Sequence, residues 1–94
     1  MTKTLVPLKT SGRVTTAADA AVTLITVPAG ARYTHFFFRN YSANNALVSI
    51  DGGTVWIPLD AGESLGWQEA EIWQTVQVKN ETAGLNVTVS AEIA

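Results

Sequence analysis

The sequence predicts an all-β protein, a small antiparallel β-sandwich or jelly-roll-like domain with an extended N-terminal arm. Residues 86–93 alternate apolar and polar side chains, which is typical of a strand with one buried face. An Asp-Gly-Gly sequence at residues 51–53 separates two apolar segments and supplies the positive φ of a hairpin turn. No window longer than about ten residues repeats apolar positions at helical spacing, so we expect no long helix.

The N-terminal 20 residues differ in composition from the rest of the chain. They are rich in Thr, Ser and Ala and contain Pro7 and Gly12, which favours an extended arm or an irregular edge strand. A chain of 94 residues has room for one hydrophobic core. We therefore assign residues 1–20 to the arm or edge strand and residues 21–94 to a single β-sandwich domain.

Four further segments are expected to be strands. Residues 46–50 and 72–79 alternate, with one apolar face each. Residues 22–27 and 33–41 are more continuously apolar, and we expect both to be covered on two faces.

A weak internal repeat suggests how the strands are grouped. Residues 24–30 resemble residues 56–62, since each segment ends in Ala-Gly and is followed by an aromatic segment and an Asn-containing loop. This pattern predicts two similar sheet-forming halves that share one core. Such a sandwich leaves sheet edges that another copy could cover.

Size and composition favour association with other chains. A domain this short is only marginally stable without disulfides, a metal or partner subunits. The chain has no cysteine and a single histidine, His35, which excludes disulfides and zinc sites built from thiolates or several histidines. Hydrophobic residues make up 47% of the chain and charged residues only 15%, which favours a homo-oligomer that covers apolar surface.

Charge is divided unevenly along the chain. Residues 1–40 hold five basic residues against one acidic residue, a net +4, whereas residues 41–94 hold one lysine against seven acidic residues, a net −6. One interpretation is an ordinary solvated surface; the other is head-to-tail contact between copies or docking of the basic N-terminus on an acidic neighbour. The acidic total and the absence of a dense Lys/Arg cluster argue against nucleic-acid binding.

The sequence holds little that could carry out catalysis. His35 lies in an aromatic segment without a nucleophile signature nearby, and it is better interpreted as a structural residue. The carboxylates near residues 60–71 fit solvated loops better than the acid pair of a glycosidase, and no glycine-rich phosphate loop is present. We therefore expect no enzyme activity, no catalytic residues, no cofactor and no metal.

The aromatic residues are the main candidates for function. They fall into a tryptophan group and a stripe with Arg39 along residues 33–41, and the basic residues before position 20 could join them at an interface. Core packing is one interpretation of these residues, a subunit interface is the second, and a sugar-binding platform is the third. The interface candidates are Trp56, Trp67, Trp73, Tyr33, Phe37, Arg39, Tyr41, Lys3, Lys9 and Arg13.

No apolar run approaches the roughly 20 residues needed to span a bilayer, and the N-terminus lacks the apolar stretch of a signal peptide. We therefore expect no membrane partner and synthesis in a cytoplasm without a signal peptide.

The run Val48-Ser-Ile-Asp-Gly-Gly-Thr-Val-Trp-Ile-Pro-Leu-Asp-Ala-Gly-Glu-Ser-Leu-Gly-Trp67 resembles a pattern of small bacteriophage virion structural proteins, in which Asp-Gly-Gly leads to a Trp-containing strand and an Ala-Gly-Glu turn. The resemblance extends over about residues 22–93 and assigns no functional residue. It implies a virion component made in the bacterial host, such as a capsid decoration protein, a head-fibre piece or a tail accessory. It also implies many copies, often trimers, and a capsid or tail protein as partner. A carbohydrate-binding or lectin-like domain, with a glycan partner, is the alternative function.

Overall fold

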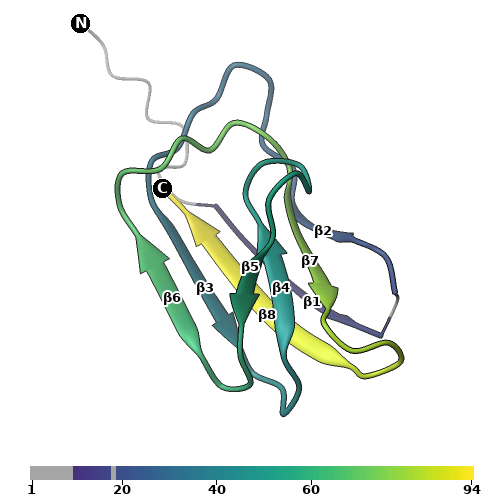
Figure 1. Ribbon diagram of the computed structural model, residues 1–94. Helices are drawn as coiled ribbons and strands as arrows, with labels where there is room; N and C mark the ends of the chain where they lie inside the picture. The colour runs from purple at the N-terminus through teal and green to yellow at the C-terminus, as the bar shows by residue number, and fades with distance from the viewer. Residues whose placement is uncertain (1–9, 18) are drawn as a thin grey trace, which may run out of the picture.

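The computed structural model describes residues 10–17 and 19–94 of the chain, and in this part all regular structure is β. No described segment forms a helix that is long and apolar enough to cross a membrane. Lys3 and Lys9 lie outside the described residues. The eight strands are β1 (Thr10–Thr16), β2 (Val22–Ile25), β3 (Phe36–Asn40), β4 (Ala46–Ser49), β5 (Ile57–Leu59), β6 (Ser64–Trp67), β7 (Val76–Asn80) and β8 (Val87–Ile93) (Figure 1).

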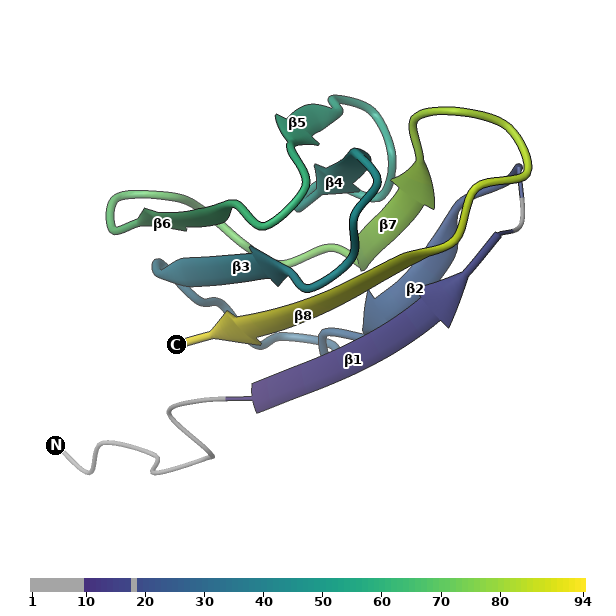
Figure 2. The same cartoon turned by 90° about the horizontal axis from the view of Figure 1, so that it is seen from below.

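The strands form two four-stranded antiparallel sheets that pack as a sandwich. Sheet A has the order β1-β8-β3-β6 and sheet B the order β2-β7-β4-β5 (Figure 2). The first strand pairs with the eighth, the second with the seventh, the third with the sixth and the fourth with the fifth. The chain is therefore one long hairpin rolled into two sheets, which is a jelly roll. This confirms the predicted all-β sandwich.

The prediction of two sheet-forming halves is wrong. Each sheet takes two strands from the first half of the chain and two from the second, so the halves interleave. The repeat describes two matching turns instead. The amide of Ala31 donates to the carbonyl of Pro28 at 3.0 Å and that of Glu63 to the carbonyl of Asp60 at 2.9 Å, with the intervening glycine at positive φ in each turn.

The core lies between the sheets and follows the alternation of the strands. In β8, Val87, Val89 and Ala91 are fully buried, and the residues between them are only partly buried, which confirms the half-buried strand predicted there. Val76 and Val78 in β7 and Ile72, which precedes β7, are fully buried too, as their predicted apolar face requires.

The prediction that residues 33–41 are covered on both faces is wrong. Phe36 and Phe38 are buried, whereas Phe37 is 43% exposed and Arg39 is exposed. Residues 22–27 also expose Thr23. A two-layer sandwich covers only the inner face of each sheet, so the outer face of β3 presents its side chains to solvent.

The Asp-Gly-Gly hairpin is confirmed, with a loop of residues 50–56 between β4 and β5. The loop folds around one carboxylate. Asp51 Oδ1 accepts the amides of Thr54 at 3.1 Å and Val55 at 3.0 Å and the hydroxyl of Ser49 at 2.7 Å. These bonds give the backbone amides of the loop hydrogen-bond partners, which a loop longer than a two-residue turn needs.

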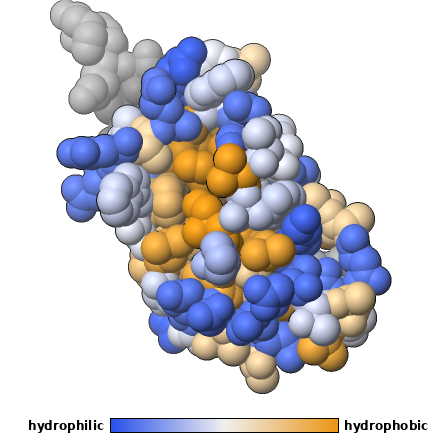
Figure 3. All heavy atoms as spheres, viewed as in Figure 1, coloured by the Kyte–Doolittle hydropathy of each residue, from blue (hydrophilic) through white to orange (hydrophobic). Residues whose placement is uncertain are grey.

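Apolar side chains are incompletely covered along one side of the sandwich, where each sheet ends in an edge strand. On the edge strands β5 and β6, the inward side chains of Ile57 and Leu65 are only partly buried, and Trp67 at the end of β6 is 59% exposed. Figure 3 shows a band of apolar residues in the middle of the face viewed in Figure 1, where these strands lie.

Candidate interaction surface

The outer face of sheet A collects several of the predicted interface residues. Register aligns Arg13 of β1 with Ser90 of β8, Ser90 with Arg39 of β3, and Arg39 with Ser64 of β6. Arg13 and Arg39 are therefore two strands apart, about 10 Å at the backbone. Tyr41 continues beyond β3 and is 48% exposed.

Two arginine side chains converge on the ring of Tyr41. The guanidinium carbon of Arg13 lies 4.2 Å from the ring centroid and that of Arg39 lies 5.1 Å from it, both within cation–π range. The tyrosine hydroxyl is 3.5 Å from the hydroxyl of Ser90. Neither guanidinium forms an ion pair with a described residue. The result is a concentrated positive charge around one exposed aromatic ring.

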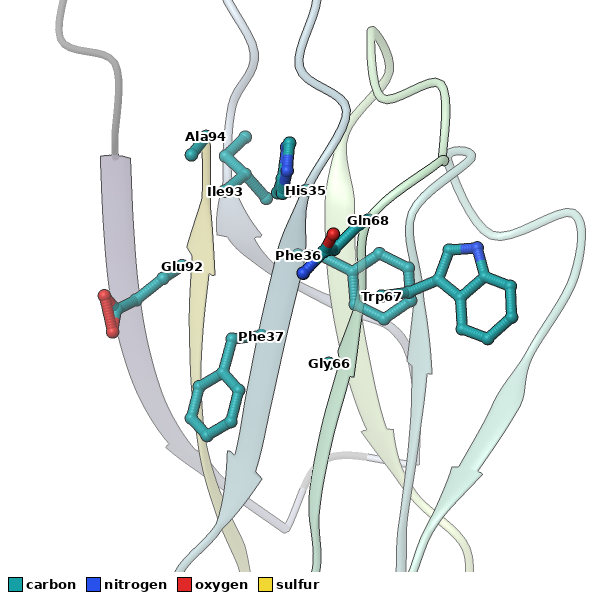
Figure 4. A pocket seen from close by; sticks show the side chains of 9 residues that line it. All are labelled: His35, Phe36, Phe37, Gly66, Trp67, Gln68, Glu92, Ile93 and Ala94. Atoms are coloured by element: carbon teal, nitrogen blue, oxygen red, sulfur yellow. The ribbon is translucent and has the colours of Figure 1, made fainter.

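A hollow of about 520 Å³ lies beside Phe37 on the same sheet. It exists because Gly66, which pairs with Phe37, has no side chain to fill the outer face of β6. His35, Gln68 and Glu92 line it as well, and Figure 4 shows the indole of Trp67 directed away from Phe37 and Glu92. The hollow therefore combines the ring of Phe37 with an amide, an imidazole and a carboxylate, and Phe36 and Trp67 line it as well.

The three tryptophans do not form one platform. Trp56 is half-buried in the β4–β5 loop, with the Nζ atom of Lys79 4.4 Å from its ring. Trp73 is 52% exposed between β6 and β7, and the guanidinium of Arg32 lies 5.6 Å from its ring. No cation covers the ring of Trp67 among the described residues.

Tyr33 does not lie on this surface. Its amide donates to the carbonyl of Ile72 at 2.9 Å, and the amide of Ile72 donates back at 2.8 Å. This isolated bridge precedes β3, so the alternation of the strand does not extend to Tyr33, and the side chain is buried in the core.

Sequence reasoning missed Gln68, Glu92 and the hollow at Gly66. The alternation of residues 86–93 places Glu92 on the outward face, a signal that was available. The hollow has no local signal, because it depends on which residue of β3 faces Gly66.

The described residues hold no group of three or more His, Cys, Asp or Glu side chains that could bind a metal ion. The Nδ1 atom of His35 lies 2.7 Å from the hydroxyl of the neighbouring Thr34, so this ring nitrogen is engaged in a local hydrogen bond.

A scan against models of protein families finds no match, and a search of the curated proteins finds no similar sequence.

Proposed function

We propose that this chain is a non-enzymatic bacteriophage structural protein, which self-associates, favouring a trimer, and decorates or joins a capsid or tail. One observation carries the proposal: the outer face of sheet A exposes Phe37 and Tyr41 beside Arg13 and Arg39. Aromatic residues and arginine are enriched at the buried centre of protein interfaces and carry much of the binding energy there.

The fold and the size of the chain support the same proposal. Jelly rolls occur in viral capsid domains as well as in lectins, although a fold by itself does not assign a function. A 94-residue domain buries a smaller share of its surface on folding than a larger domain does, and association stabilises the folded state by mass action. The protein would be made in the cytoplasm of the bacterial host and end in the virion.

Two measurements test the proposal. Sedimentation of the full chain should give a mass above that of a 10.0 kDa monomer, and the chain should bind particles of the phage that encodes it when they are prepared without it. Replacing Phe37 with Ser should weaken association, whereas Val55→Ser, in the β4–β5 loop, should not. A stable monomer that leaves such particles bare would refute the proposal.

Carbohydrate binding is the second candidate, and the uncovered ring of Trp67 favours it. Flat exposed indoles can stack on apolar faces of sugar rings, and a jelly roll is also a lectin architecture. Retention on a glycan array or affinity gel that is lost in Trp67→Ala but kept in Trp56→Ala would support it. Equal retention of both variants, or none with any glycan, would count against it.

A further inference from the structure

One end of the sandwich is acidic. The loops that join β1 to β2, β3 to β4, β5 to β6 and β7 to β8 lie together there (Figure 1). They contain no Lys or Arg, and they hold the acidic residues Asp19, Asp60, Glu63 and Glu81. We call this region the acidic loop end.

Hydrogen bonds fix the position of several of these carboxylates. The side-chain amide of Asn45 donates to Glu81 at 3.1 Å, and its carbonyl oxygen accepts the amide of Ala61 at 3.0 Å. Glu63 accepts the amide of Asp60 at 2.9 Å. Asn45 therefore brings Glu81 beside the turn that carries Asp60 and Glu63, and hydrogen bonds hold the carboxylates of Glu81 and Glu63 in place.

The complementary charge is on the outer face of sheet A. Arg13 and Arg39 both lie against the ring of Tyr41, so two like charges share one site without a described acidic partner. A carboxylate placed between the guanidiniums would offset their repulsion and could accept paired N–H bonds from either. Tyr41 belongs to the β3–β4 loop, so this basic face adjoins the acidic loop end of the same molecule without an ion pair between their described residues.

We propose that the acidic loop end of one copy docks on the Arg13–Tyr41–Arg39 face of a second copy. The two surfaces have opposite charge and belong to the same chain, so every copy brings both halves of the contact. When the contact is made head to tail, its repetition closes a ring or extends a filament, and when two copies make it reciprocally across one interface, they form a twofold dimer. This inference rests on the self-association in the proposed function and specifies its surfaces.

A charge-swap experiment on the full chain tests the contact. One variant carries Arg13→Glu and Arg39→Glu, and the other carries Asp60→Lys and Glu81→Lys. Each alone should raise the dissociation constant by about tenfold or more, because like charges then face each other. In an equimolar mixture every contact between the two variants again joins opposite charges, so association should be restored. Restoration is complete in a dimer, a filament or an even-numbered ring and partial in a ring of three, which keeps one contact between like variants. The control Arg32→Glu changes charge away from both surfaces and should associate like the original chain.

Milder variants guard against misfolding. Arg13→Gln with Arg39→Gln, and Asp60→Asn with Glu81→Gln, remove charge, while the side-chain carbonyl introduced by Glu81→Gln still offers an acceptor to Asn45. They should weaken association less than the reversals, and raising the salt from about 0.05 M to about 1 M should weaken association of the original chain. Circular dichroism should show that every variant used is folded.

The outcomes separate this inference from the proposed function. One outcome is that the original chain self-associates and binds phage particles while the charge variants and their mixture associate as strongly as the original chain does. In that case the docking contact is wrong and the proposed function stands. If the original chain neither associates nor binds particles, both are wrong. If each charge-reversed variant associates weakly by itself and the mixture of the two associates again, the docking contact is supported.

Discussion

Gly12 in β1 lies directly against the main-chain carbonyl oxygen of Leu24 in β2, so close that a Cβ atom on Gly12 would overlap that oxygen. The two strands belong to different sheets, and this approach joins sheets A and B along one side of the sandwich. A main-chain atom cannot rotate away as a side-chain end can, so the contact tolerates only glycine.

Gly12→Ala should therefore destabilise the fold by about 2 kcal/mol or more, because β1 must move away from β2. Urea unfolding followed by circular dichroism measures the loss. The matched control is Gly66→Ala in β6, whose added Cβ would meet its nearest atom, in Phe37, at an ordinary 3.4 Å and should change stability little. Equal stability of both variants would show that β1 does not depend on this approach.

Asn40 is 1% exposed and uses both ends of its amide. Its nitrogen donates to the carbonyls of Asn44 at 2.8 Å and Leu59 at 3.0 Å, and its oxygen accepts the amide and the hydroxyl of Ser42. Asn40→Asp removes the donor and places a buried carboxylate against two carbonyls, which should cost about 3 kcal/mol at neutral pH.

The same variant should show an inverted pH dependence. The surrounding carbonyls would raise the pKa of an aspartate at position 40, so its folded state would hold a proton that the unfolded state releases, and stability should fall as pH rises above about 4. Urea midpoints at acidic and neutral pH measure this. Asn86→Asp, on an exposed residue, is the control and should show neither effect.

Asp51 should make the β4–β5 loop sensitive to acid. Partial burial raises the pKa of its carboxyl, but the amide of Val55, the hydroxyl of Ser49 and the amide of Thr54 together outweigh burial and lower the pKa below its usual value. A lowered pKa contributes stability above the unfolded value of about 4, and that stability is lost as pH falls through the folded value.

Asp51→Asn should therefore lose about 1 kcal/mol at neutral pH and approach the original chain in acid, because charge-assisted bonds become neutral ones. Thermal unfolding across pH measures the difference, with Glu69→Gln on an exposed residue as control. A constant gap between Asp51→Asn and the original chain at all pH values would contradict the assignment.

Tyr33 and Trp67 should respond in opposite ways to truncation. Tyr33 is 7% exposed in the core, so Tyr33→Ala should cost about 3 kcal/mol or more. Trp67 is 59% exposed, and Trp67→Ala should change the stability of the monomer by less than about 0.5 kcal/mol. Chemical unfolding at low protein concentration separates the two; similar losses would show that Trp67 is buried in solution.

Local sequence patterns predicted where the individual strands lie better than which strands pair with each other. The alternation of residues 86–93 and the Asp-Gly-Gly turn depend on nearby residues, and both predictions hold. The pairing of β1 with β8 joins residues about as far apart as the described chain permits, and no local period encodes such a partner. The repeat marks two similar turns and carries no information about which strands pair.

The candidate surface was only partly predictable, because the sequence shows which residues of one strand share a face but not which strands lie side by side. Phe37 and Arg39 share a face by alternation, which the sequence shows, but Arg13 joins them only through β8, which lies between β1 and β3. Tyr33 was placed on that face because alternation was extended past the start of β3, where the chain makes only an isolated bridge. Composition alone did not show that β3 has one solvent-facing side.

The nested strand pairing also determines when the domain can be completed during synthesis. Among the described strands, only β4 and β5 pair as neighbours in the chain, and each further pair of the nest joins segments that are more distant. β8 occupies the interior of sheet A between β1 and β3, so that sheet cannot form until β8 has left the ribosome. Folding should therefore follow the synthesis of β8 and be slow, in the range of milliseconds to seconds that is typical of non-local β topologies.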